Sequence, residues 1–220
     1  MDAAQARENR RVWDAIGPSF DATRDRPWAP VVQFLRGRAP GARVADLGCG
    51  NGRHLSAALG AGLRPVGLDV SAPLLRSAAA TSAPVARGVL ERPPFRAEAF
   101  DAAICIAAMH HVRGRGNRVG TWRALRALVR PKGRILASAW STEARAAEGR
   151  RTRRPQEGPT EPGDRWVAWG DGPDPPVRFV HFYAADELAA ELSEAGWSVE
   201  RAWDVALTGG QADNRFVEAA

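Results

Sequence analysis

Three glycines and two acids in the first third of the chain have the types and spacing of a cofactor site. Asp46 ends a short apolar run, and Gly48, Gly50 and Gly52 follow it at every second position. Glycines permit positive φ and lack the Cβ atoms that would keep a ligand away from the backbone. The segment after them is expected to begin a helix, whose unpaired N–H groups attract a negative or polar ligand end.

A second acid narrows the class of ligand. Residues 65–70 are typical of a strand, in which Asp69 stands 21 positions after Gly48. An acid at the tip of the second strand can hold the two hydroxyls of a ribose. Dinucleotide sites use the spacing G-x-G-x-x-G, whereas this loop has G-x-G-x-G. We therefore expect an adenosine-containing cofactor. The loop alone would also fit an ordinary strand-to-helix turn.

Alternating strands and helices would bring these residues to one edge of a sheet. Apolar runs predict strands at residues 43–47, 65–70, 84–89, 100–107 and 134–140. Helices are expected at residues 3–16, 30–38, 53–60, 72–80 and 117–130. This order predicts the α/β class, with a parallel sheet and helices on both faces. Residues 177–183, 186–195, 197–204 and 215–219 would add a strand, a helix and a final antiparallel pair.

Length and charge fit one domain that meets a polyanion. The chain has 220 residues, enough for a full core, and its net charge is +6 with Lys132 as its only lysine. An excess of positive charge favours nucleic acid, although a GC-rich genome would also raise the arginine count. Residues 142–176 are rich in Arg, Glu, Pro and Gly, and we expect a long mobile loop there within a single domain over 1–220.

Cysteine usage and hydropathy point to the cytoplasm. Cys49 and Cys105 do not have the spacing of a zinc site, and they fit a reducing compartment. No apolar run approaches the roughly 20 residues that a membrane span needs. The polar residues 1–11 are not typical of a secretory signal.

The glycine loop resembles the S-adenosylmethionine (SAM) loop of class I methyltransferases. The resemblance covers residues 12–140 and, more loosely, 177–219, and within the family it is strongest to the tRNA wobble-uridine carboxymethyl methyltransferases. Its finer part consists of I-G-P-S-F at 16–20 leading to T-R-D-R-P-W at 23–28, D-L-G-C-G-N-G at 46–52, I-C-I-A-A-M-H-H at 104–111, and residues 118–131 followed by Trp140. R-F-V-H-F at 178–182 also resembles the C-terminal segment of that branch. It implies a Rossmann-like, doubly wound, mostly parallel seven-stranded sheet with an antiparallel C-terminal strand.

The same resemblance implies which residues bind SAM, with S-adenosylhomocysteine as the product. These are Asp46, Gly48, Cys49, Gly50, Asp69, Val70, Val89, Leu90 and Ala107. The family usually has an acid facing the adenine amine where this chain has Val89. Backbone groups of Val89 and Leu90, or the side chain of Glu91, would then serve instead.

The branch forms 5-methoxycarbonylmethyluridine by esterifying a carboxymethyl group. A carboxylate is already ionised at neutral pH, so the protein must mainly align the reacting atoms in a dry site. The catalytic candidates are Arg24, His110 and His111. Arg24 is expected to hold the acceptor carboxylate, the uridine or the cofactor carboxylate, and one of the histidines to contact the base or its carboxylate.

Four further residues are expected to bind the substrate. Trp140 and His181 would complete the pocket, while Arg150 and Arg151 would contact tRNA phosphates. Structural roles compete with the site assignments. The histidine pair would pack under the following helix, and Arg24 would pair with Asp21 or Asp25 at the surface. His181 would face solvent from its strand, and residues 150–154 would belong to a solvated loop. No metal is expected at the histidine pair, because adjacent side chains of an extended chain point apart. Trp13, Trp28 and Trp122 are expected in the core.

Other functions fit parts of the pattern. A methyltransferase acting on a small metabolite would have the same loop and fold. An NAD-dependent oxidoreductase is disfavoured by the glycine spacing and by Asp46, and a silent binding subunit is disfavoured by the intact acids and glycines. The expected partners are a tRNA anticodon stem-loop and, by the resemblance, a small zinc-ribbon activator subunit.

Overall fold

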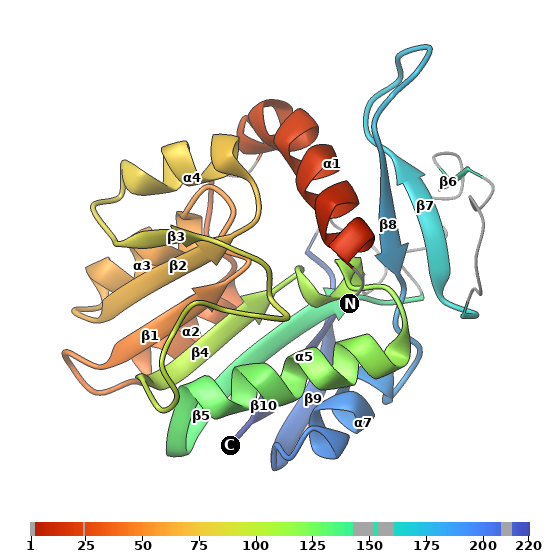
Figure 1. Ribbon diagram of the computed structural model, residues 1–220. Coiled ribbons are helices and arrows are strands. Elements are labelled where there is room, and N and C mark those ends of the chain that lie inside the picture. The colour runs from red at the N-terminus through yellow and green to blue at the C-terminus, as the bar shows by residue number, and fades with distance from the viewer. Residues whose placement is uncertain (1–2, 24, 143–151, 154–160, 208–212) are drawn as a thin grey trace.

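One seven-stranded sheet organises the chain (Figure 1). A computed structural model describes residues 3–23, 25–142, 152–153, 161–207 and 213–220. The sheet strands are β1 (Arg43–Leu47), β2 (Arg64–Asp69), β3 (Val85–Arg87), β4 (Phe100–Ile106), β5 (Val129–Trp140), β9 (Val199–Val205) and β10 (Asn214–Ala219). Their spatial order is β3-β2-β1-β4-β5-β10-β9.

The directions of these strands match the prediction. Pairs from β3 through β5 are parallel, and β10 is antiparallel to both β5 and β9. The α/β class and the mostly parallel sheet with an antiparallel C-terminal strand are therefore confirmed. β5 begins at Val129 and not at residue 134 as predicted, and near its start the register with β4 shifts and Lys132 has φ 65°.

Helices cover both faces of the sheet. They are α1 (Ala3–Asp21), α2 (Ala29–Arg36), α3 (Arg53–Gly60), α4 (Ala72–Ala79), α5 (Arg115–Leu128) and α7 (Glu187–Glu194), with a short 3₁₀ helix η1 (Met109–His111). Side chains alternate across a strand, so Ala103 and Cys105 of β4 pack on the side of α5 and α7. Ala102 and Ile104 pack on the opposite side, with α2 and α3.

Helix α1 is longer than predicted. The sequence predicts an end at Gly17-Pro18, and this is wrong, since α1 continues to Asp21 with Pro18 inside it. Gly17 is buried, and a Cβ there would lie 3.0 Å from the Oγ of Ser71, so the glycine lets α1 pack closely against α4. Ser71 Oγ also donates to the carbonyl of Trp13 at 3.0 Å, which fixes α1 over the carboxyl end of the sheet.

A small second sheet stands beside α1 (Figure 1). It consists of β6 (Thr152–Arg153), β7 (Asp164–Ala168) and β8 (Val177–His181), with β7 and β8 forming an antiparallel hairpin. The prediction of one loop over 142–176 is therefore wrong for β6 and β7. The apolar residues Trp166 and Val167 of β7 are buried. The prediction missed this strand because the average composition of residues 142–176 is polar and charged, although this short run within it is apolar.

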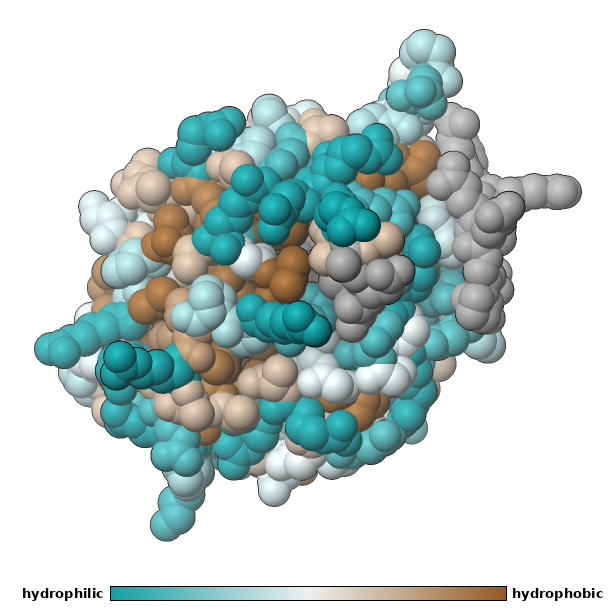
Figure 2. Space-filling model, in the orientation of Figure 1, coloured by the Kyte–Doolittle hydropathy of each residue, from teal (hydrophilic) through white to brown (hydrophobic). Residues whose placement is uncertain are grey.

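Charged and polar side chains cover most of the described surface. On the face drawn in Figure 2, hydrophobic residues show as small areas between hydrophilic ones. Leu59 is the one large hydrophobic side chain that is exposed in the described part of the chain. None of the described helices has the length and apolar character that crossing a membrane requires.

Candidate active site

A cleft of about 1070 Å³ opens at the carboxyl ends of β1, β2 and β4. This is the edge at which open α/β sheets bind ligands. It is lined by the glycine loop after β1, by α1 and η1, and by Trp140 and the β8 residue Arg178.

The loop glycines have two different structural reasons. Gly48 has φ 85°, and a Cβ there would lie 2.4 Å from the Cβ of Ala108, so the loop can approach η1 only with glycine. Gly50 has φ 55° and faces open space, so its lack of a side chain leaves room in the cleft. The predicted glycine turn is therefore present, and it exposes backbone to a ligand.

Asp69 at the end of β2 is held by the loop. Its Oδ2 accepts a hydrogen bond from the backbone N–H of Gly50 and its Oδ1 accepts one from that of Ser71, each at 2.8 Å. Burial raises the pKa of Asp69, and these hydrogen bonds oppose the rise. Each carboxylate oxygen has a second lone pair, so Asp69 can still accept hydrogen bonds from two ribose hydroxyls.

Asp46 is a buried acid beneath the loop. It is 1% exposed, and neither of its carboxylate oxygens has a hydrogen-bond partner among the described residues. Burial and then the nearby charge of Asp69 raise the pKa of Asp46 to about 8, against a smaller opposite effect of Arg53. A buried carboxylate without partners is unfavourable, so this position favours a positive group at the loop.

These features fit SAM. The orphaned carboxylate of Asp46 suits the ammonium of the cofactor's amino-acid end, Gly50 leaves room for that end, and Asp69 suits the ribose. Of the predicted cofactor residues, Asp46 lies behind the cleft wall. The rest line the cleft: Gly48, Cys49, Gly50, Asp69, Val70, Val89, Leu90 and Ala107.

The cleft wall at Val89 and Leu90 also carries an acid. Val89 and Leu90 line the wall as predicted, and Glu91 lines it beside them. Oε1 of Glu91 is buried without a hydrogen-bond partner among the described residues, and burial raises the pKa of this carboxyl. Glu91 can therefore meet an adenine amine from a position two residues beyond the usual one.

His110 and His111 lie together in η1 and are buried. Their Nε2 atoms are 3.1 Å apart, so the prediction that their side chains point apart is wrong. That prediction assumed an extended chain, whereas the 3₁₀ turn after β4 directs both rings to one side. Both rings line the cleft.

One tautomer assignment satisfies every ring nitrogen of the pair. The backbone N–H of Trp140 donates to Nδ1 of His110 at 3.3 Å, and Nδ1 of His111 donates to the carbonyl of Phe179 at 2.7 Å. The Nε2–H of His110 then donates to Nε2 of His111. Burial lowers the pKa of His111 to about 3 and that of His110 well below its ordinary value. Both rings are therefore neutral and have no nitrogen left for a proton from a substrate.

An arginine that the sequence analysis did not select lies next to the pair. Arg178 lines the cleft and is 4% exposed. Its guanidinium carbon lies 5.6 Å from the ring centroid of Trp13 and 5.0 Å from those of Trp140 and Trp169. Trp140 therefore lies at the cleft as predicted. Trp13 also lines the cleft, where a core position was expected, and Trp28 lines the cleft while it packs against the core beside Phe216. Trp122 is fully buried, as expected.

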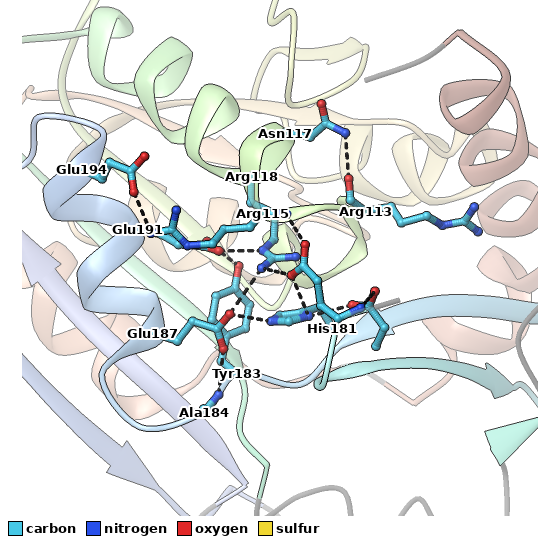
Figure 3. A network of polar contacts seen from close by, with 12 residues as sticks. Arg113, Arg115, Asn117, Arg118, His181, Tyr183, Ala184, Glu187, Glu191 and Glu194 are labelled. Carbon is cyan, nitrogen blue, oxygen red and sulfur yellow. Dashed lines mark hydrogen bonds and ion pairs between the residues drawn. The ribbon is translucent and has the colours of Figure 1, made fainter. Parts of the chain in front are cut away.

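His181 lies outside the cleft wall, in a polar network on the other face of β8 (Figure 3). Residues 178 and 181 are three positions apart, so they point to opposite faces of the strand. Nδ1 of His181 is 2.8 Å from Asp164 Oδ1, and Nε2 is 2.9 Å from Glu187 Oε1. Burial alone would lower the pKa of His181, but these two hydrogen bonds outweigh it and raise the pKa.

The network joins the hairpin to two helices. Arg118 of α5 is fully buried and lies 2.8 Å from both Glu161 and Glu191. Glu161, Asp164 and His181 have the atom types and spacing of a metal site, but the Arg118 guanidinium already supplies positive charge there. The network thus anchors β8 and, through it, Arg178.

The structure leaves some of the predicted residues undescribed. Arg24, Arg150 and Arg151 lie outside the described residues, so their roles stay predictions. Sequence reasoning also missed His54, which lines the cleft, and whose pKa is lowered to about 3 by burial and then by Arg53. Arg178 could have been selected from the sequence because it is a charged residue in an otherwise apolar strand. His54 could have been selected because it lies in the first helical turn after the glycine loop.

Comparison with known proteins agrees with this geometry. Residues 45–137 match the methyltransferase domain family. A tRNA (carboxymethyluridine(34)-5-O)-methyltransferase of Arabidopsis thaliana is 36% identical over 137 residues, which are 60% of this chain and 32% of that protein. The chain thus spans about a third of the length of this relative.

Solved structures share the fold at low identity. The 1,6-didemethyltoxoflavin-N1-methyltransferase of Burkholderia thailandensis has a TM-score of 0.72 at 18% identity, over 97% of this chain and 87% of its own. A methyltransferase solved with the Trm112 methyltransferase activator of Haloferax volcanii has a TM-score of 0.70 at 16% identity, over 96% of each chain. Residues 45–137 thus match the methyltransferase domain family, and the strand order of the chain is that of the fold shared with these solved structures.

Proposed function

We propose that the chain is a SAM-dependent methyltransferase that esterifies the carboxymethyl group of the wobble uridine in a tRNA anticodon. The observation that carries the choice of acceptor is the neutral histidine pair. Every ring nitrogen of His110 and His111 is engaged, and the pKa of each ring is far below 7. An acceptor that had to lose a proton would find no base in this pair, whereas a carboxylate needs none.

The chemistry of the step follows from these charges. Bound SAM supplies the methyl group on a positively charged sulfur. A carboxylate oxygen of the acceptor forms the new bond to the methyl carbon as the carbon–sulfur bond breaks, and no proton moves. The negative charge of the carboxylate and the positive charge of the sulfur both disappear in this step. A site without water favours it, because water would stabilise the charged reactants more than the neutral products. The buried histidine rings and the half-buried aromatic rings of the cleft provide such a site.

The chain's own residues would align the two reactants. Asp69 and the loop backbone would hold the cofactor, with Asp46 buried beneath the loop, while η1, Trp140 and α1 would enclose the acceptor. Arg150 and Arg151 are expected to contact tRNA phosphates, and Arg24 the acceptor or the cofactor carboxylate. The relative from Arabidopsis thaliana supports the tRNA substrate, because its name states that reaction.

The proposal is tested by methyl transfer to defined RNAs. Purified protein is incubated with methyl-labelled SAM and two anticodon stem-loops that differ only in the wobble base. One carries 5-carboxymethyluridine and the other plain uridine. We expect label in the first RNA alone. Label in a small metabolite of a deproteinised extract, with none in either RNA, would favour the metabolite methyltransferase instead.

A small zinc-ribbon activator subunit is the partner that we propose alongside tRNA. The support is the neighbour of the same fold that was solved with the Trm112 methyltransferase activator. Since Leu59 is the single exposed large hydrophobic side chain among the described residues, we expect the domain to fold without such a subunit. Activity of the purified chain measured with and without an added activator of this kind tests the point.

A further inference from the structure

Arg178 is a buried cation in the wall of a cleft that was assigned to an anionic acceptor. It comes from β8, whereas the tryptophans around it come from α1, β5 and the residue after β7. Segments far apart in the chain therefore meet to place one guanidinium beside the histidine pair. The three aromatic rings stabilise the buried charge through cation–π contacts.

The guanidinium of Arg178 is suited to an anionic ligand at this wall. Its N–H groups are directional donors, and a carboxylate accepts two of them in parallel. The neighbouring histidines are neutral and already saturated within the pair. The positive charge is felt throughout this wall, since after burial Arg178 contributes to lowering the pKa of His110 and His111. The wall thus attracts an anion of the substrate.

We propose that Arg178 binds the carboxylate of the methyl acceptor and sets the preference of the site for an acid over a neutral group. This assignment rests on the proposed function. The planar guanidinium matches a carboxylate with two parallel N–H···O bonds, which lysine cannot reproduce. Trp140 and Trp13 keep the guanidinium in place, and the network around His181 holds its strand.

The charge balance gives Arg178 a defined kinetic role. The carboxylate is negative before transfer and neutral as an ester, so the arginine holds the substrate more tightly than the product. An interaction that weakens toward the transition state contributes to KM and product release, and it does not raise kcat. Loss of Arg178 is therefore expected to raise KM about 10- to 100-fold while kcat stays the same or rises.

The test compares an acid with its neutral isostere. Binding to the protein loaded with S-adenosylhomocysteine is measured for stem-loops carrying 5-carboxymethyluridine or 5-carbamoylmethyluridine. The wild type should bind the acid about 10- to 100-fold more tightly. Arg178→Gln should bring this ratio to about one and keep the affinity for the amide RNA, and Arg178→Lys should give an intermediate ratio.

Arg113→Gln is the matched control. Arg113 also lies over two aromatic rings, those of Trp166 and Phe179, but it is not part of the cleft wall. This variant should keep the wild-type ratio. If Arg178→Gln fails to bind S-adenosylhomocysteine, Arg178→Lys takes its place in the test. A lower ratio of acid to amide affinity than in the wild type then supports the assignment, and an unchanged ratio overturns it.

The outcomes separate this inference from the proposed function. A wild-type ratio near one, or a wild-type ratio kept by Arg178→Gln, overturns the role of Arg178. If label still transfers to the carboxymethyl RNA in that case, the proposed function stands. Absence of label transfer by the wild type overturns the proposed function itself, and the carboxylate assignment with it.

Discussion

Replacing Asp46 by Asn removes the buried acid beneath the glycine loop. The pKa of Asp46 is raised to about 8 by burial, so at pH 7 the carboxyl of the free protein is about nine-tenths protonated. A bound ammonium favours the ionised form. SAM binding at pH 7 should therefore release about 0.9 proton from Asp46, and the asparagine variant should release correspondingly fewer.

The same linkage sets how affinity depends on pH. Ionising a group one unit below its pKa costs about 1.4 kcal/mol, which is a tenfold loss of affinity. The ratio of SAM affinities, wild type over Asp46→Asn, should thus rise about tenfold from pH 6 to pH 7, more slowly toward pH 8, and then level off. The cofactor's own amino group titrates equally with both proteins and cancels in this ratio.

The assay is titration calorimetry in two buffers with different ionisation enthalpies, which gives the number of protons released. Asp101→Asn is the matched control, because Asp101 lies at the start of β4, far from the loop, and pairs with Arg130. It should release as many protons as the wild type. Equal release by the wild type and Asp46→Asn would refute the assignment of Asp46 to the cofactor's ammonium.

Thermal unfolding of the free protein gives an independent readout of Asp46. The folded state binds this proton more tightly than the unfolded state, whose Asp pKa is about 3.9. The wild type therefore loses stability as the pH rises from about 4 through 8, and the asparagine variant does not. Asp46→Asn should raise the Tm of the free protein, and by more at pH 9 than at pH 6.

Three further predictions follow from the site. Gly48→Ala should destabilise the fold by about 3 kcal/mol, because its Cβ would lie 2.4 Å from Ala108, whereas Gly50→Ala should lower SAM affinity with a much smaller change in Tm. His181→Gln should lower the free energy of unfolding by about 3 kcal/mol at pH 6 and by less at pH 9. The pKa of His181 is raised in the folded protein, so the stability that the protonated ring contributes is lost as the pH rises through that pKa. Urea unfolding at both pH values measures the difference. The kcat should be level between pH 6 and 8, because His111 has a pKa of about 3; a bell-shaped profile centred near 6.5 would count against the neutral pair.

The cofactor half of the site was predictable because its signals are local. Asp46 to Gly52 are contiguous, and the bond between Asp69 and Gly50 N–H follows from two adjacent parallel strands. Turn chemistry and strand order therefore suffice to place these groups. Glu91 is the exception, since nothing local shows that its side chain turns into the cleft.

The acceptor half could be predicted only in part because it is assembled from distant segments. The sequence placed His110 and His111 at the right edge, but their contact depends on a 3₁₀ turn and on the backbones of Trp140 and Phe179. Arg178 lies 130 positions after Gly48 and reaches the cleft only because β7 and β8 form a hairpin. Composition averaged over 142–176 hid that hairpin.

The chemical stability of the transferred label tests the central claim most directly. The protein is incubated with methyl-labelled SAM and the stem-loop carrying 5-carboxymethyluridine, and the recovered RNA is treated with mild alkali. A methyl ester would release its label as methanol, and this is the result we predict. Label that stays on the RNA would mean methylation of nitrogen or carbon, and it would contradict transfer to an ionised carboxylate.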